Sequence, residues 1–137
     1  MSAEDLASRQ RILIVDDEES TRLLLARMVS TELKAEVQLA GTSVQALRLA
    51  ESSVYDAILL DILMPGMDGF ELLRRIRENT PNAATPVIVV SILSDDKSAE
   101  RARSLGASAY HVKPIRRPEL INMIRRELAA ARRAESR

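Results

Sequence analysis

Acidic side chains stand directly after two apolar runs of this sequence, in positions where they could do chemistry. Asp16 and Asp17 follow the run at 11–15, and Asp61 follows the run at 58–60. Short apolar runs of this kind are typical of buried strands. In open α/β sheets, ligands bind beyond the carboxyl ends of the strands. We therefore expect these three carboxylates to share one site.

Two later apolar runs end in a hydroxyl and in an ammonium group, at Ser91 and at Lys113. If all these strand ends meet at one edge, three carboxylates repel one another and Lys113 offsets only one of the charges. The excess negative charge predicts a divalent cation, and oxygen ligands favour Mg²⁺, with Mn²⁺ as its substitute, over zinc. Such a site can handle a phosphoryl group, and Asp61 is the predicted nucleophile that forms an acyl phosphate.

The elements that position these residues are predicted from five apolar runs that alternate with five amphipathic segments. Strict alternation indicates an α/β fold with a parallel sheet, right-handed crossovers and helices on both faces. We expect a single doubly wound, flavodoxin-like domain with strand order 2-1-3-4-5, in which the first and third strands are neighbours. The expected strands are 11–15, 35–40, 58–60, 87–90 and 107–112, and the expected helices are 18–31, 42–52, 68–79, 94–105 and 118–128.

The spacing of apolar residues gives the expected helices a buried and an exposed face. In the first helix, Leu24 is expected to face the core, and Arg22 and Arg27 are expected to face solvent. In the second helix, Val44 is expected to face the core. Capping boxes are predicted at Thr42 with Gln45 and at Asp68 with Glu71.

Composition limits the classes of function that this chain can have. With 137 residues, it can form one domain with a proper core. It has 20 basic and 20 acidic residues, so no net charge draws it to nucleic acid or to a membrane surface. It contains no cysteine, and its single histidine, His111, excludes a multi-histidine metal site. We expect a cytoplasmic protein without a membrane span.

The domain boundaries follow from where the patterning starts and stops. Residues 1–10 lack an apolar block and are expected to form a disordered lead. The folded domain is expected at 11–128. Residues 129–137 are expected to extend the last helix as a fraying tail rich in alanine and arginine.

The order and spacing of these motifs resemble the response-regulator receiver domains of bacterial two-component signalling, over about Arg11 to Leu128. One such motif alone would be weak, but four in order at the family's spacing are specific. The motifs are Ile14-Val15-Asp16-Asp17, then Leu60-Asp61-Ile62-Leu63-Met64-Pro65-Gly66-Met67-Asp68-Gly69, then Ser91 thirty positions after Asp61, and Tyr110-His111-Val112-Lys113-Pro114.

The resemblance implies a role for each residue of the site. Asp61 would accept the phosphoryl group, and Asp16, Asp17, Asp61 and the backbone carbonyl of Leu63 would hold Mg²⁺. Ser91, Lys113 and the backbone of Leu63 and Ile92 would bind phosphoryl oxygens. Tyr110 would be the switch aromatic that follows Ser91, and the Lys113-Pro114 bond would be cis. The apolar side chains of Leu63 and Ile92 would flank the phosphoryl group, which predicts slow to moderate self-hydrolysis.

The resemblance also implies partners. The phosphoryl donor would be a phosphohistidine on a sensor histidine kinase or on a histidine phosphotransfer protein. Phosphorylation would alter the surface of the fourth helix, fifth strand and fifth helix. That surface would then control an output domain or effector protein, or form a phosphorylation-dependent homodimer. Direct nucleic-acid binding and membrane association are not expected, and the only catalysis implied is of the chain's own phosphorylation and dephosphorylation.

Other interpretations of the same residues stay open. The chain could be a receiver-fold module that binds its partner constitutively, without phosphorylation. It could be a phosphatase or phosphotransferase with an aspartyl intermediate, although such enzymes need a second acid and a cap over the substrate. A flavodoxin-like cofactor binder would need a Ser/Thr/Gly phosphate-binding loop where this chain has Asp16 and Asp17. Asp17 could simply cap the first helix, and Asp16 could be a solvated turn residue.

Overall fold

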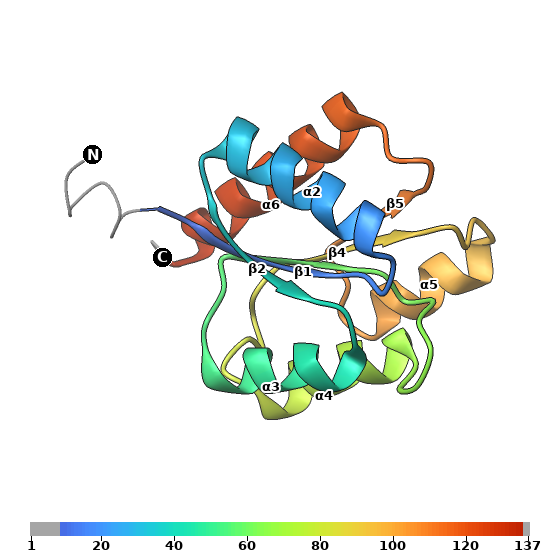
Figure 1. Cartoon of the computed structure of the whole chain (residues 1–137). Helices are drawn as coiled ribbons and strands as arrows, with labels where there is room; N and C mark the ends of the chain where they lie inside the picture. The colour runs from blue at the N-terminus through green and yellow to red at the C-terminus, as the bar shows by residue number, and fades with distance from the viewer. Residues whose placement is uncertain (1–8, 136–137) are drawn as a thin grey trace.

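The strands and helices alternate along the whole described chain, as the sequence predicts (Figure 1). The structure is a computed structural model, and it describes residues 9–135. The predicted lead therefore lies mostly outside the described residues. The strands are β1 (Arg11–Val15), β2 (Glu36–Ala40), β3 (Ala57–Leu60), β4 (Val87–Ser91) and β5 (Ala109–Val112), and the helices are α2 (Glu19–Leu33), α3 (Ser43–Ser52), α4 (Gly69–Asn79), α5 (Asp96–Ser104) and α6 (Arg117–Glu135).

The five strands form one parallel sheet in the order β2-β1-β3-β4-β5, which confirms the predicted fold class. Helices α2 and α6 cover one face, and α3, α4 and α5 cover the other (Figure 1). Each face has its own apolar core between the sheet and its helices. No helix among residues 9–135 is long and apolar enough to cross a membrane.

The central strands are buried except at Arg11, because helices cover both faces of the sheet. Every residue of β3 is buried, in agreement with the uniformly apolar run that predicts it. In the register of β1 with β3, Val15 lies opposite Leu60. The next residues along the two strands, Asp16 and Asp61, therefore leave the sheet side by side.

In two helices, one residue that was predicted to face the core is exposed instead, while Leu25, Met28 and Val29 of α2 are buried as their spacing predicts. Leu24 of α2 is 50% exposed and Val44 of α3 is 52% exposed, so both inward assignments are wrong. Helix α3 instead buries Ser43, Ala46 and Ala50. Leu47 and Leu49 are partly buried and pack against the same core, so of the larger apolar residues of α3 only Val44 faces solvent.

The helix ends also differ in part from the predictions. The side chain of Asp68 caps α4 by accepting from Phe70 N and Glu71 N, but Glu71 does not complete the predicted capping box. Glu71 instead binds Arg74 and Arg75, whose guanidinium groups compete for its carboxylate. At the other end of the chain, α6 continues to Glu135, through most of the segment 129–137 that was predicted to extend the last helix. Alanine and arginine are strong helix formers, which accounts for the added turns.

Candidate functional site: an acid cluster with a lysine

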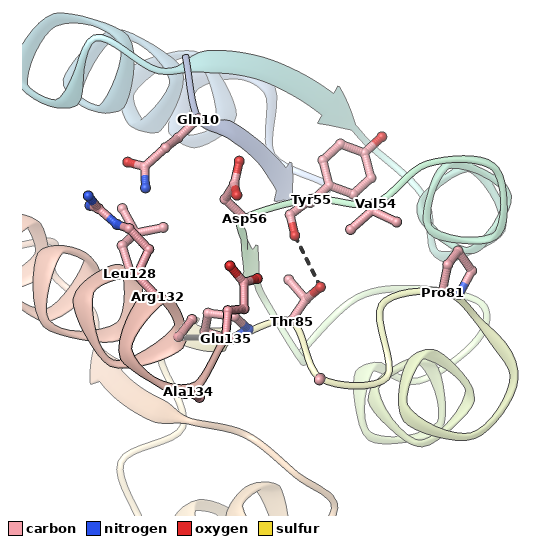
Figure 2. A pocket seen from close by; sticks show the side chains of 13 residues that line it. Gln10, Val54, Tyr55, Asp56, Pro81, Thr85, Leu128, Arg132, Ala134 and Glu135 are labelled. Carbon is pink, nitrogen blue, oxygen red and sulfur yellow. Dashed lines mark hydrogen bonds between the residues drawn. The ribbon is translucent and has the colours of Figure 1, made fainter. Parts of the chain in front are cut away.

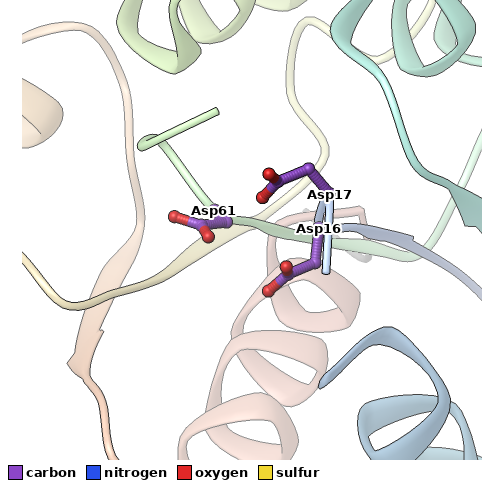
Figure 3. Close-up of side chains that lie close together, drawn as sticks. All are labelled: Asp16, Asp17 and Asp61. Atoms are coloured by element: carbon purple, nitrogen blue, oxygen red, sulfur yellow. The ribbon is translucent and has the colours of Figure 1, made fainter. Parts of the chain in front are cut away.

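Three carboxylates meet at the carboxyl edge of the sheet (Figure 3). Asp16 and Asp17 come from the segment after β1, and Asp61 comes from the end of β3. One carboxylate oxygen from each lies within 4.8 Å of the others. Asp16 and Asp61 are buried, with 1% and 6% exposure, whereas Asp17 is exposed. Solvent therefore reaches the cluster on the side of Asp17.

Lys113, directly after β5, lies between two of these acids. Its Nζ donates to Oδ2 of Asp16 at 3.0 Å and to Oδ2 of Asp61 at 3.1 Å. The backbone N–H of Lys113 donates to the carbonyl of Ser91 at 2.8 Å, which ties the ends of β4 and β5 together. The Lys113–Pro114 peptide bond is cis. The structure thus brings the predicted lysine onto the acids although 52 residues separate it from Asp61.

Burial and charge act on the two central groups in opposite ways. Burial raises the pKa of Asp61, and neither the Leu63 N–H nor the Lys113 ammonium fully offsets that cost. The nearby charge of Asp16 raises the pKa of Asp61 further. For Lys113, burial alone lowers the pKa, but its contacts with Asp16 and Asp61 outweigh burial and leave the pKa raised. Positive charge beyond that of one ammonium would therefore stabilise the ionised carboxylates of the site.

The donor set of the cluster fits a hard divalent cation. Among the described residues, the group contains only carboxylates, with no histidine or cysteine. Carboxylate oxygens with one solvent-facing side suit Mg²⁺ or Mn²⁺, which retain several water ligands. The backbone of Leu63 lies beside the cluster, because Leu63 N donates to Oδ1 of Asp61 at 3.0 Å.

The other predicted site residues lie at the end of β4, in β5 and in the segments that follow β3 and β4. Ser91 is fully buried, and its Oγ accepts from the N–H of Leu93 at 3.2 Å. The hydroxyl of Tyr110 donates to the carbonyl of Leu93 at 2.7 Å. Leu93 therefore connects both residues of the predicted switch. The side chains of Leu63 and Ile92 are 49% and 61% exposed, and their effect on self-hydrolysis stays a prediction.

The interpretation of Asp17 as a helix cap is wrong. Glu18 occupies the N-cap position of α2, and no side chain caps it. The carboxylate of Asp17 makes no hydrogen bond or ion pair within residues 9–135. Asp16 does form a turn, because its Oδ1 accepts from Glu18 N at 2.9 Å, but it is buried instead of solvated and its other oxygen binds Lys113.

Arg22 contacts the backbone of this site, although its spacing in the first helix predicts a side chain that faces solvent. It is half-buried, and its Nη1 donates to the backbone carbonyl of Asp16 at 2.8 Å. Its guanidinium lies against Gly41, the residue after β2. A glycine at a strand end can mark a close approach, and this is the one signal in the sequence that could have identified the contact.

His111 supports the loop that carries Lys113, and it sets a pH dependence. It is buried, and its Nε2 accepts the N–H of Arg116 at 3.2 Å. Burial lowers the pKa of His111, the charge of Arg116 lowers it further, and Glu119 opposes both. As pH falls below about 6.5, the unfolded chain therefore takes up this proton before the folded chain does. The contribution of His111 to the free energy of unfolding should be fully present above that pH. It should decline below that pH, with a slope of at most about 1.4 kcal/mol per pH unit.

Urea unfolding of the wild type and of His111→Gln at pH 7.5, 6.5 and 5.5 measures this effect. We expect the wild type to lose stability relative to the variant as pH falls, because only the wild type carries the imidazole. If the two curves of unfolding free energy against pH run parallel, His111 does not supply the slope.

A separate hollow of about 410 Å³ opens at the opposite edge of the sheet (Figure 2). Tyr55 and Asp56, which precede β3, and Pro86, which precedes β4, form one side of it. Leu128 and Glu135 of α6 form the other side. The predicted site residues do not line this hollow, because they follow the strands instead of preceding them.

The fold and the acid cluster define a doubly wound α/β domain with an acidic site at its carboxyl edge. The family described as the response regulator receiver domain matches residues 12–125. The chain belongs to this family, which confirms the resemblance predicted from its motifs. Receiver domains act in two-component signalling, where phosphorylation and Mg²⁺ binding are typical, and they interact with histidine kinases and output domains.

Two relatives illustrate how much of a longer protein this chain corresponds to. The response regulator ArlR of Staphylococcus saprophyticus is 37% identical over 118 residues, which are 84% of this chain and 50% of ArlR. The cyclic di-GMP phosphodiesterase response regulator RpfG of Xanthomonas campestris is 38% identical over 112 residues, which are 80% of this chain and 29% of RpfG. The chain thus spans half or less of these two curated relatives.

Solved structures share the fold along nearly their whole length. A CheY-like receiver domain protein from Methanospirillum hungatei has a TM-score of 0.86 at 28% identity, covering 93% of this chain and 99% of that one. The receiver domain of the sensor histidine kinase PA1611 from Pseudomonas aeruginosa has a TM-score of 0.79 at 29% identity, covering 89% of this chain and 99% of that one. The PA1611 structure has a magnesium ion coordinated in its active site cleft.

Proposed function

We propose that this chain is a phospho-acceptor switch in which Asp61 takes a phosphoryl group from a phosphohistidine. The donor would be a sensor histidine kinase or a histidine phosphotransfer protein. The observation that carries the proposal is the contact of Lys113 with both Asp16 and Asp61, inside a cluster of three carboxylates within 4.8 Å. Such a cluster combines an acceptor, a place for a dication and an ammonium for the phosphoryl oxygens.

In the proposed transfer, a carboxylate oxygen of Asp61 attacks phosphorus and a new P–O bond forms. The P–N bond to the imidazole breaks, its electron pair stays on nitrogen, and a solvent proton completes the neutral histidine. Lys113, the hydroxyl of Ser91 and the backbone N–H groups of Leu63 and Ile92 bind the phosphoryl oxygens. Asp16, Asp17, Asp61 and the carbonyl of Leu63 would hold Mg²⁺, which would supply positive charge to offset the negative charge of the transferring group.

The proposed output is a rearrangement around Leu93. Ser91 accepts from the Leu93 N–H and Tyr110 donates to the Leu93 carbonyl, so a phosphoryl group that recruits Ser91 disturbs both contacts. The change would reach the surface of α5, β5 and α6, which would control an effector, an output domain or a homodimer. The proposed domain is 11–128, with 1–10 as a lead and 129–137 as an extension of α6. Its cytoplasmic location stays a prediction.

Labelling by acetyl phosphate, a small phosphoryl donor, tests the metal dependence of the proposal. The wild type is expected to incorporate label with Mg²⁺ and to lose it when EDTA replaces Mg²⁺. Asp17→Asn should raise the Mg²⁺ concentration for half-maximal labelling at least about tenfold, since losing a ligand exceeds the loss of an outer contact. Glu19→Gln, two residues away and exposed, is the matched control and should behave as the wild type. An extent of labelling that is the same with EDTA as with Mg²⁺ would refute the proposal.

A further inference from the structure

Arg22 connects the first helix to the backbone of the acid cluster. Its Nη1 lies 2.8 Å from the carbonyl oxygen of Asp16, so a side chain of the first turn of α2 reaches back to the backbone after β1. Gly41 leaves the room for this contact. A Cβ at position 41 would lie 2.9 Å from Nη1 and 3.3 Å from Cζ of Arg22. Any side chain at position 41 would therefore push the guanidinium away.

The carbonyl that Arg22 holds belongs to the peptide unit between Asp16 and Asp17. In an extended strand, successive side chains point to opposite faces. For Asp16 and Asp17 both to reach Asp61, the chain must therefore turn at this peptide. Its orientation decides where the second carboxylate points.

The two neighbouring acids are fixed to very different degrees. Asp16 is held at both oxygens, by Glu18 N at 2.9 Å and by Lys113 Nζ at 3.0 Å. Asp17 is exposed, and its carboxylate has no hydrogen-bond partner within residues 9–135. The direction of the Asp17 side chain therefore depends on its backbone, and Arg22 is the side chain that binds the carbonyl just before it.

We propose that Arg22 is a positioning residue that aims Asp17 at the metal, with Gly41 providing the space. The inference rests on the proposed function, because it takes Asp17 as a ligand. Without Arg22, the peptide between Asp16 and Asp17 can rotate, and the binding of a cation must then restrict that motion. Partners that orient metal ligands typically contribute 10-fold to 100-fold in metal affinity. We expect about tenfold here, since Asp17 is one ligand of several.

Mg²⁺ titration of the unphosphorylated protein by calorimetry tests the inference without any phosphoryl transfer. Arg22→Met, which keeps an unbranched apolar stem and removes the donors, should raise the Kd for Mg²⁺ about tenfold. Arg27→Met, on the exposed face of the same helix, is the matched control and should leave the Kd unchanged. Gly41→Ala should raise the Kd in the same direction while the melting temperature changes little, because a mobile side-chain end can yield to the added methyl.

Double variants identify the route of the effect. If both residues act through one contact, Gly41→Ala adds nothing in the Arg22→Met background. If Arg22 acts through Asp17, Arg22→Met raises the Kd much less in the Asp17→Asn background than in the wild type. Fully additive effects in both cycles would overturn the inference.

The outcomes for the inference and for the proposed function are separable. A wild type that binds Mg²⁺ together with an Arg22→Met variant of equal Kd would overturn the inference alone, even if that variant melted at a lower temperature. If Arg22→Met fails to fold, Gly41→Ala decides the question. A wild type that binds no Mg²⁺ at millimolar concentration would refute the proposed function, and with it the premise that Asp17 is a ligand.

Discussion

Asp61→Asn is expected to abolish the labelling of the protein by acetyl phosphate. The amide that replaces the carboxylate is a poor nucleophile, and none of the other acids holds the same place at the end of β3. The variant should nevertheless remain folded. Burial raises the pKa of Asp61, so the charged carboxylate is disfavoured in the native state.

The sign of that pKa shift makes a stability measurement informative. A group whose pKa is raised on folding contributes stability when protonated and loses it as pH rises through the folded pKa. Replacement of Asp61 by a neutral amide removes the cost of burying a charge, so the melting temperature at pH 7.5 should be no lower than that of the wild type. Loss of labelling with an intact melting transition then assigns the defect to chemistry.

Asp56→Asn is the matched control for this experiment. It makes the same substitution on an exposed residue at the opposite edge of the sheet, next to β3. Its labelling should equal that of the wild type. Label that persists in Asp61→Asn at the wild-type level would show that another residue accepts the phosphoryl group.

Gly69→Ala is expected to cost about 3 kcal/mol or more of unfolding free energy and to disturb the acid cluster. Gly69 begins α4, and its N–H donates to the carbonyl of Ile62 at 3.1 Å. A Cβ at position 69 would lie 2.2 Å from the Cα of Ile62 and 2.6 Å from its carbonyl oxygen. Backbone atoms cannot yield as a flexible side chain does, so the segment after Asp61 must shift. That segment carries Leu63, whose N–H binds Asp61.

Gly66→Ala is a stringent control, because it makes the same change in the same loop. Gly66 has φ of +84°, and a Cβ there would meet nothing within 4 Å. Its replacement should therefore cost only the strain of a left-handed alanine, about 1–2 kcal/mol. Urea unfolding of both variants measures the difference. The close-approach explanation fails if Gly69→Ala is no less stable than Gly66→Ala.

The parts of the fold that the sequence predicts are those governed by local patterning. The run Ile58-Leu59-Leu60 is apolar on both faces of the strand, which leaves a covered parallel sheet as its natural setting, and β3 is buried throughout. The acid cluster could be predicted too, because parallel strands bring their carboxyl ends to one edge. Asp16, Asp17, Asp61 and Lys113 meet for that topological reason.

The contacts that the sequence does not predict depend on the three-dimensional meeting of distant segments. Arg22 was assigned to solvent from the spacing of the apolar residues in the first helix. Its contact with the backbone needs both the turn after β1 and the bare backbone of Gly41. The predicted capping box at α4 failed because Arg74 and Arg75 lie one turn away from Glu71 and carry the stronger charge-assisted contacts.

Asn82 is a second residue whose role was hidden in the sequence. It stands in the segment between α4 and β4, where a polar residue ordinarily faces solvent, yet it is completely buried. Its side chain replaces secondary-structure hydrogen bonds for three separate segments. Its Nδ2 donates to the carbonyls of Ala50 and Ser53, and its Oδ1 accepts from Tyr55 N and Thr85 Oγ1.

Identification of the residue that carries the phosphoryl group tests the central claim most directly. The wild type is labelled with acetyl phosphate and Mg²⁺, the acyl phosphate is reduced with borohydride, and the peptides are mapped by mass spectrometry. Reduction of an aspartyl phosphate leaves homoserine, which we expect at position 61 and at no other aspartate. Homoserine at position 16, 17 or 56, or a borohydride-resistant phosphate on Ser91, would contradict the account.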